Sequence, residues 1–291
     1  MSHNAPKRQI SVDVSRIERW RAVERFMSLP SGWRILRSGD LAWLHPTPSL
    51  RWYQRFYDES YLADAQSPVF PEDPWFQRRR LSYFGARLKR VVRHLGETPA
   101  SLLEIGAGDG LFLVAAQQLG IAATGIDVST PAREDAKRLH GVDIIAGDLL
   151  SSDLPLAERY DLVVLNHVLE HLITPLDYLA RIRTLLSPRG LLVFEIPQQF
   201  INPIDLAYRA LRLRRPLGVY TLHHPYFYTV SSTRRLMDAA GFRIERLTTW
   251  LPSQVFHVKK PWVTKPLQVV LWAADRLAKR GHVIEVFARP A

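Results

Sequence analysis

Three glycines at alternating positions follow a short apolar run before the middle of the chain. Residues 102–105 supply the run, and Gly106, Gly108 and Gly110 follow it directly. Glycine adopts positive φ at no steric cost and lets a ligand lie against the main chain, where a Cβ would collide. We therefore predict a buried strand, a glycine turn and a helix over 111–119, whose N-terminal amides point at the contents of the turn.

The spacing of these glycines distinguishes two classes of cofactor. A dinucleotide site favours G-x-G-x-x-G, whose third glycine would fall on Leu111 here, so we exclude a nicotinamide oxidoreductase. The chain instead reads E-x-G-x-G-x-G, with Glu104 two residues before the first glycine. A carboxylate there contributes little to a pyrophosphate but suits a cofactor with an amine and a sulfonium. This segment resembles the first motif of class I S-adenosylmethionine-dependent methyltransferases.

Two acids end the next predicted strands, 122–127 and 142–148. Asp127 follows the glycine turn by about 20 residues, the spacing at which an acid meets ribose hydroxyls. The alternative is that Asp127 only caps the helix that starts near 129–131. The resemblance implies that Asp127 binds the ribose and that Asp148 accepts from the adenine amine.

The fourth predicted strand, 160–167, runs into Val-Leu-Glu-His. This passage resembles the family motif D-x-V-x-x-x-x-V-L-E-H. Asn166 and His167 would lie at the carboxyl end of the strand, where open α/β sheets bind ligands. The letters H-x-x-E-H also match an inverted zinc-protease signature, but that site needs a long helix, and Pro175 follows closely. We therefore expect no metal.

The cofactor-binding residues implied by the resemblance are Glu104, Gly106, Ala107, Gly108, Gly110, Asp127, Val128, Asp148, Leu149, Asn166 and His167.

A second group of residues could remove a proton from a methyl acceptor. His223 and His224 precede Tyr226 in a histidine-aromatic turn, which resembles the family segment that borders the substrate pocket. His171 and Tyr226 are further candidates, and a purely structural role remains the alternative for each histidine. We rank His224 first as general base, because it lies in the substrate region rather than in the cofactor motif.

Strands and helices alternate from 78 to 197, which predicts a parallel sheet with right-handed crossovers. Further strands are expected at 191–197, 243–250 and 282–289, with a turn at 187–190 and helices at 78–95, 133–140, 177–186, 231–240 and 266–279. The resemblance implies a Rossmann-like, seven-stranded, mostly parallel α/β sheet. Its last strand would be antiparallel, and helices would cover both faces. We expect an N-terminal accessory segment over 1–74 and a methyltransferase domain over 75–291. A helical substrate-side insertion, the lid, would occupy 198–228.

The N-terminal segment predicts an amphipathic helix over 11–27, then a short strand that enters a proline turn at 46–48. This order resembles the leader of a methyltransferase subgroup that includes sugar and natural-product enzymes and often carries a cysteine zinc ribbon. The 291 residues contain no cysteine, so no ribbon zinc is inferred.

The composition bounds the remaining classes. The chain is 47% hydrophobic and 23% charged, and it contains no apolar run near the roughly 18 residues of a membrane span. We expect a soluble, cytoplasmic protein. The net charge of +11 suits nucleic acid, an anionic substrate or a lipid surface. The arginines are scattered apart from clusters such as 209–215, so we do not expect nucleic acid, and peripheral membrane contact stays open.

The predicted activity is methyl transfer from S-adenosylmethionine to an oxygen, or to a carbon or nitrogen, of a small molecule such as a sugar, nucleotide-sugar or natural product. The alternatives are an RNA or lipid-linked acceptor, or a non-catalytic partner protein with a methyltransferase fold. The sequence gives no oligomeric state.

Overall fold

A computed structural model describes residues 14–24, 29, 31–49, 52, 74–198, 224–250 and 281–291. The chain divides into two compact units, one comprising Met1–Pro48, His167–Leu176 and Phe194–Ala291, the other Ser49–Asn166 and Asp177–Val193. Most of the expected lid, His223 and the helix expected at 266–279 lie outside the described residues. Among the described helices, none combines the length and apolar character that a membrane crossing requires.

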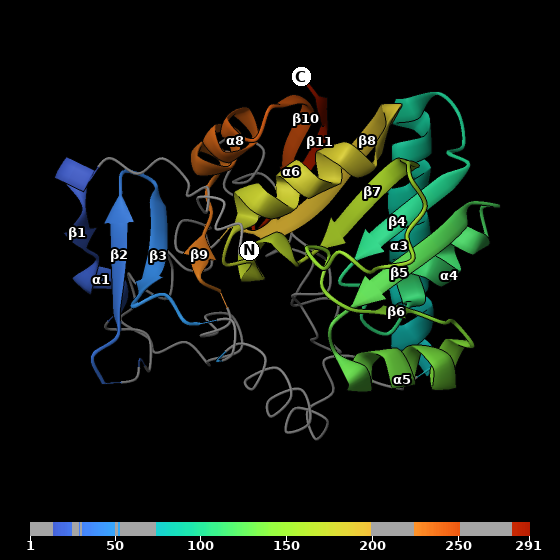
Figure 1. Cartoon of the computed structure of the whole chain (residues 1–291), viewed down its shortest axis with the longest axis horizontal. Helices are drawn as coiled ribbons and strands as arrows, with labels where there is room; N and C mark the ends of the chain where they lie inside the picture. Colours follow the sequence, from blue (N-terminus) through green and yellow to red (C-terminus); the bar gives the residue numbers. More distant parts are fainter. Residues whose placement is uncertain are drawn as a thin grey trace, which may run out of the picture. The chain divides into compact units, whose positions relative to one another are not determined.

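Seven strands form one sheet in the described residues, in the order β10-β11-β8-β7-β4-β5-β6 (Figure 1). Strand β4 pairs in parallel with β5 and β7, β5 pairs in parallel with β6, and β10 pairs antiparallel with β11. The predicted mostly parallel sheet with an antiparallel last strand is therefore confirmed. The strands are β4 Ser101–Ile105, β5 Ala122–Asp127, β6 Ile145–Ala146, β7 Tyr160–Asn166, β8 Leu186–Pro197, β10 Phe242–Trp250 and β11 Val283–Pro290.

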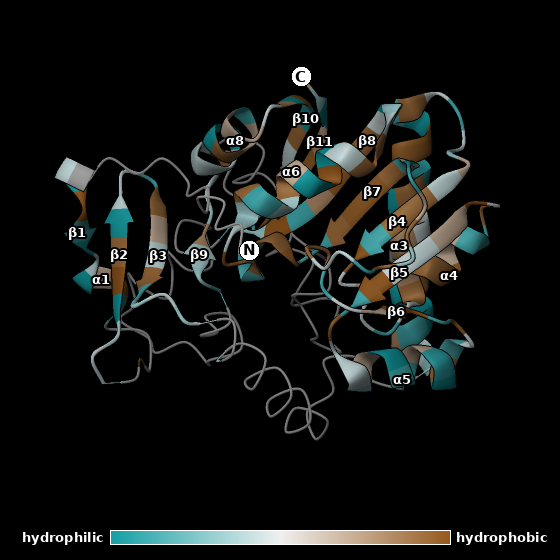
Figure 2. Ribbon diagram, in the orientation of Figure 1, coloured by the Kyte–Doolittle hydropathy of each residue, from teal (hydrophilic) through white to brown (hydrophobic). Residues whose placement is uncertain are grey.

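Helices cover the strands of the second unit. They are α3 Pro74–Leu95, α4 Leu111–Gln117, α5 Thr130–His140 and α6 Pro175–Leu185. In the view of Figure 1, α3 runs behind β4 and β5. The ring of Phe84 on α3 meets Phe112 on α4 edge-on, with centroids 5.3 Å apart. Figure 2 shows hydrophobic residues concentrated along β4 and β7, whereas α5 is mostly hydrophilic.

Helix α5 begins and ends where its sequence requires. Ser129 is the N-cap, and its hydroxyl accepts a 3.3 Å hydrogen bond from the amide of Ala132. Gly141 ends the helix in the left-handed conformation, with φ of 67°. These local signals fix the segment that follows Asp127.

The first unit contains a four-stranded sheet in the order β1-β2-β3-β9. Its strands are β1 Glu18–Arg19, β2 Arg34–Ser38, β3 Leu41–His45 and β9 Tyr226–Phe227. Ile35, Leu44 and Phe227 pack in its core, each at most 2% exposed. Asp40, in the turn between β2 and β3, accepts hydrogen bonds from Thr229 and Arg235. Thr229 is the N-cap of helix α8 (Val230–Ala239), so the N-terminal hairpin is tied to the start of this helix.

Three local predictions differ from the structure. The helix expected over 11–27 is wrong over 14–20, where a short 3-10 helix (Val14–Arg16) and β1 precede the single turn α1 (Arg21–Glu24). Pairing with β2 prevails there: the amide of Trp20 donates to the carbonyl of Ile35 at 2.7 Å. The strand expected over 142–148 is reduced to β6, and the turn expected at 187–190 lies within β8.

Candidate functional site

The glycine turn after β4 has the conformation that its sequence predicts. Gly106, Gly108 and Gly110 have φ of 69°, 55° and 74°, in the left-handed region that disfavours side chains. Asp109 stands between the last two glycines, and Arg80 of α3 donates to its two carboxylate oxygens at 2.5 and 3.0 Å. Both side chains are buried, so a charge pair anchors the turn to α3. The sequence prediction did not include this pair.

Glu104 is a buried carboxyl group with one open oxygen. It is 2% exposed, and its Oε1 accepts a 2.7 Å hydrogen bond from Nδ2 of Asn166. Its Oε2 is buried and has no hydrogen-bond partner among the described residues. Burial raises the pKa of Glu104 well above its ordinary value, against the opposing effects of the Asn166 hydrogen bond and the charge of Arg87. This carboxyl group therefore gains strongly from a cationic ligand.

Asp127, the last residue of β5, lies at the mouth of the glycine turn. Its Oδ2 accepts from the amide of Gly108 and its Oδ1 from the amide of Ser129, each at 2.8 Å. Burial raises the pKa of Asp127 despite these two hydrogen bonds. Each carboxylate oxygen has a second lone pair, so the group retains capacity to accept from two hydroxyls. The structure thus brings Asp127 to the turn.

Asp148 follows β6 and is fixed from two sides. Its Oδ1 accepts from the amide of Leu150 at 2.8 Å, and the hydroxyl of Tyr178 donates to its Oδ2. Val128 and Leu150 are 54% and 43% exposed, whereas the predicted Leu149 is 1% exposed. Exposed apolar side chains beside both acids suit a flat heterocycle. The sequence prediction missed Tyr178 and Leu150.

These residues fit S-adenosylmethionine. Oε2 of Glu104, which has no partner in the described part of the chain, suits an ammonium group, because a buried carboxylate is costly unless it is paired. The positive-φ glycines leave main chain accessible, and Asp127 offers acceptors for ribose hydroxyls. All of these residues belong to the second unit.

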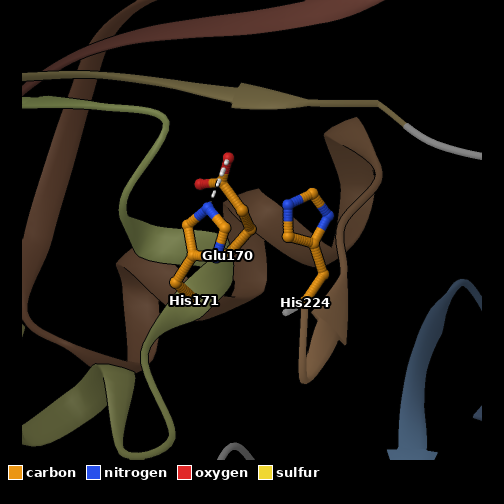
Figure 3. A group of neighbouring side chains, drawn as sticks. All are labelled: Glu170, His171 and His224. Atoms are coloured by element: carbon orange, nitrogen blue, oxygen red, sulfur yellow. Dashed lines mark ion pairs between the residues drawn. The ribbon is translucent and has the colours of Figure 1, made fainter. Parts of the chain in front are cut away.

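A cluster of ionisable side chains lies in the first unit, just after β7. Figure 3 shows the imidazole rings of His171 and His224 beside the carboxylate of Glu170. The two ring centroids are 4.6 Å apart. Oε1 of Glu170 lies 3.5 Å from Nδ1 of His167 and 4.0 Å from Nε2 of His171. Among the described residues, Glu170, His171 and His224 have ligand atoms within 4.8 Å of one another and could hold a metal ion.

The tyrosines near this cluster differ in their hydrogen bonds. The hydroxyl of Tyr226 donates to the carbonyl of Ile173 at 3.2 Å, and burial raises the pKa of this tyrosine. The hydroxyl of Tyr226 thus acts as a hydrogen-bond donor in this structure. Tyr228 is 1% exposed, its hydroxyl has no partner among the described residues, and burial raises its pKa well above the ordinary value.

His167, the residue that follows β7, has an unusual backbone. Its φ of 54° makes it the single non-glycine residue with positive φ in the described ranges. Its amide donates to the carbonyl of Glu195 at 2.9 Å, which holds this conformation. Strained backbone of this kind clusters at functional sites.

The fold and the acids around the glycine turn define a class I, S-adenosylmethionine-dependent methyltransferase, with S-adenosylmethionine as cofactor. A family model described as a methyltransferase domain matches residues 76–247, more than half of the chain. The chain belongs to this family, and the predicted class is confirmed.

Similar proteins agree with this class. A "Ubiquinone biosynthesis O-methyltransferase" of Cereibacter sphaeroides is 39% identical over 97 residues, which cover 32% of this chain and 39% of that protein. The matched segment thus spans less than half of that relative. A methyltransferase structure from Archaeoglobus fulgidus has a TM-score of 0.51 at 17% identity and covers 72% of this chain and 93% of its own. Magnesium protoporphyrin IX methyltransferase from Synechocystis has a TM-score of 0.52 at 14% identity, and the match covers 82% of this chain and 98% of that protein. These two structures share the fold.

Proposed function

We propose that this chain transfers the methyl group of S-adenosylmethionine to a hydroxyl oxygen of a small-molecule acceptor. The cofactor supplies a methyl group on a sulfonium, whose thioether leaving group is neutral, so little acid catalysis is needed. The observation that carries the proposal is the buried Glu104 with its open Oε2, in the strand that enters the glycine turn.

We assign the cofactor contacts to the second unit. Glu104 binds the methionyl amine, and Gly106 and Gly108 let the ligand approach the main chain. Asp127 accepts from the ribose hydroxyls, and Asp148 accepts from the adenine amine. Preorganised acceptors of this kind position the cofactor and exclude water from it.

We assign removal of the acceptor proton to the histidine cluster. His171 follows Asn166 by five residues, so the cluster continues the motif that ends β7. The carboxylate of Glu170 can stabilise an imidazolium on His171, and His224 is the first candidate for the base. Tyr226 is assigned a positioning role through its bond to Ile173.

The curated relatives guide the choice of acceptor. Because they are named as O-methyltransferases of ubiquinone biosynthesis, we place a phenolic hydroxyl first, before the sugar, nucleotide-sugar and natural-product hydroxyls. The net charge of +11 favours acceptors that carry a negative group. An RNA or lipid-linked acceptor remains a competing outcome of the test.

The test is a methyl-transfer screen with labelled S-adenosylmethionine. The full chain is offered phenols and catechols, sugars and nucleotide-sugars, RNA, and anionic vesicles that contain lipid-linked hydroxyls. We expect turnover in a small-molecule pool, lost about 10²- to 10⁴-fold in His224→Ala with S-adenosylhomocysteine binding retained. The exposed His45 gives the control variant His45→Ala.

Three outcomes would count against the proposal. Turnover restricted to RNA or vesicles would overturn the acceptor class. Cofactor binding without turnover on any pool would indicate a non-catalytic partner protein. Calorimetric binding of NAD in place of S-adenosylmethionine would overturn the cofactor assignment.

A further inference from the structure

Glu170, His171 and His224 converge although they come from segments more than fifty residues apart in the sequence (Figure 3). Glu170 and His171 lie on a 3-10 turn, Leu169–His171, and His224 precedes β9. One ligand atom from each lies within 4.8 Å of the others. Two imidazoles and a carboxylate in this proximity have the chemistry of a metal site.

The buried carboxylate supplies a second, independent observation. The side chain of Glu170 is 2% exposed, and its Oε2 has no hydrogen-bond partner among the described residues. A carboxylate oxygen left bare in the interior is costly unless a cation completes it. We propose that Glu170, His171 and His224 bind a divalent transition-metal ion of the zinc class.

The ligand types determine the class of ion. Imidazole nitrogen suits zinc and its first-row neighbours, whereas magnesium and calcium favour sets composed of oxygen. Three protein ligands leave a fourth tetrahedral position open, as in catalytic zinc sites. The sequence pattern H-x-x-E-H did not predict this site, because its first histidine, His167, is half-exposed and the third ligand is the distant His224.

The role of the ion rests on the proposed function, whereas its binding does not. With the ion bound, His224 is a ligand and no longer the general base. An acceptor hydroxyl at the open position would then release its proton to water at a lower pH, because a coordinated hydroxyl is more acidic. The acceptor oxygen then forms its bond to the methyl carbon as the carbon–sulfur bond breaks and the neutral thioether leaves. The ion is neither oxidised nor reduced.

The test measures metal binding directly. The full chain is stripped with EDTA, desalted and titrated with ZnCl₂ and, separately, MgCl₂ by calorimetry. Co²⁺ absorption reports the coordination geometry. We expect one Zn²⁺ per chain, a tetrahedral Co²⁺ spectrum, and at least about tenfold weaker Zn²⁺ binding in Glu170→Gln and in His224→Asn.

A matched control comes from the second unit. Nε2 of His140 lies 4.0 Å from the carboxylate of Asp109, the same separation as His171 from Glu170, but no third ligand completes that group among the described residues. His140→Asn should therefore leave Zn²⁺ affinity unchanged. Binding of S-adenosylhomocysteine, measured in each variant, reports whether the chain has folded.

The wild-type titration decides the proposal even if a variant fails to fold. Absence of stoichiometric Zn²⁺ binding, or tighter binding of Mg²⁺ than of Zn²⁺, would overturn it. So would equal Zn²⁺ affinity in the folded double variant Glu170→Gln/His224→Asn. A wild-type chain that binds Zn²⁺ but not S-adenosylhomocysteine would instead contradict the proposed function alone.

Discussion

The side-chain amide of Asn166 donates a 2.7 Å hydrogen bond to Oε1 of Glu104, which links the end of β7 to β4. Arg87 of α3 donates in turn to Oδ1 of Asn166. A guanidinium, an amide and a carboxylate thus form a chain, and hydrogen bonds in such chains strengthen one another at low dielectric. This series of hydrogen bonds fixes the orientation of Glu104 and leaves its Oε2 open.

Glu104→Gln should weaken binding of S-adenosylhomocysteine about 10- to 100-fold, because it removes a charge-assisted hydrogen bond. In the wild type, protons compete with the ligand amine for the carboxylate. Affinity should therefore rise as the pH increases through the raised pKa of Glu104, and the variant should lack this dependence. Calorimetry over a pH series measures both effects. The exposed Glu158 supplies the control Glu158→Gln, and wild-type affinity in Glu104→Gln would contradict the assignment.

Arg87→Met should shift the pH dependence of S-adenosylhomocysteine binding to higher pH, because the charge of Arg87 lowers the pKa of Glu104. Binding of 5′-methylthioadenosine, which lacks the amine, should keep its pH dependence. Arg87→Lys should restore part of the effect, and the exposed Arg78 gives the control Arg78→Met. An equal shift for both ligands would mean that Arg87 supports only the fold.

Asp127→Asn should weaken both S-adenosylhomocysteine and 5′-methylthioadenosine about tenfold, since both ligands carry the ribose. The side-chain amide of this variant has a single oxygen, so it can accept a hydrogen bond from only one of the Gly108 and Ser129 backbone amides. Side-by-side titrations of the two ligands measure the change. Asp143→Asn is the control, because the Asp143 side chain is 83% exposed. Loss of only one ligand would argue against a ribose contact.

Arg80→Met should lower the free energy of unfolding by about 3 to 5 kcal/mol, because it leaves the Asp109 charge buried without its partner. Arg80→Met/Asp109→Asn should recover part of this loss, since the second change removes the charge. Urea unfolding at neutral pH measures both variants. A double variant less stable than Arg80→Met would show that the pair's charge is not the cause.

The sequence predicts those parts of the site that depend on local order. Strand, glycine turn, helix and the acid that ends the next strand follow one another along the chain, so Gly108 and Asp127 could be placed together. Their charged partners could not be predicted in this way. Arg87 lies 79 residues from Asn166, and Arg80 lies 29 residues from Asp109. On the sequence alone, arginines of α3 are typical of a solvated face.

Tertiary pairing also explains the errors in the fold prediction. Residues 14–20 carry an apolar spacing compatible with a helix, but Glu18 and Arg19 pair with β2 instead. Strand β9 has two residues, too few to show any periodicity. Such elements exist because a neighbouring strand supplies their hydrogen bonds.

The pairing of β3 with β9 bears on how this chain can diversify. The matched family segment begins at residue 76, yet Trp43 pairs with Tyr226 and the amide of Leu44 binds the carbonyl of Pro225, the residue after His224. A substitution in the N-terminal hairpin therefore reaches the neighbourhood of His224 without altering Glu104 or Asp127. Under the proposed role of His224, selectivity for the acceptor can evolve in the N-terminal hairpin while the affinity for the methyl donor stays constant. A shortened chain starting at residue 76 would lose the strand that supports β9.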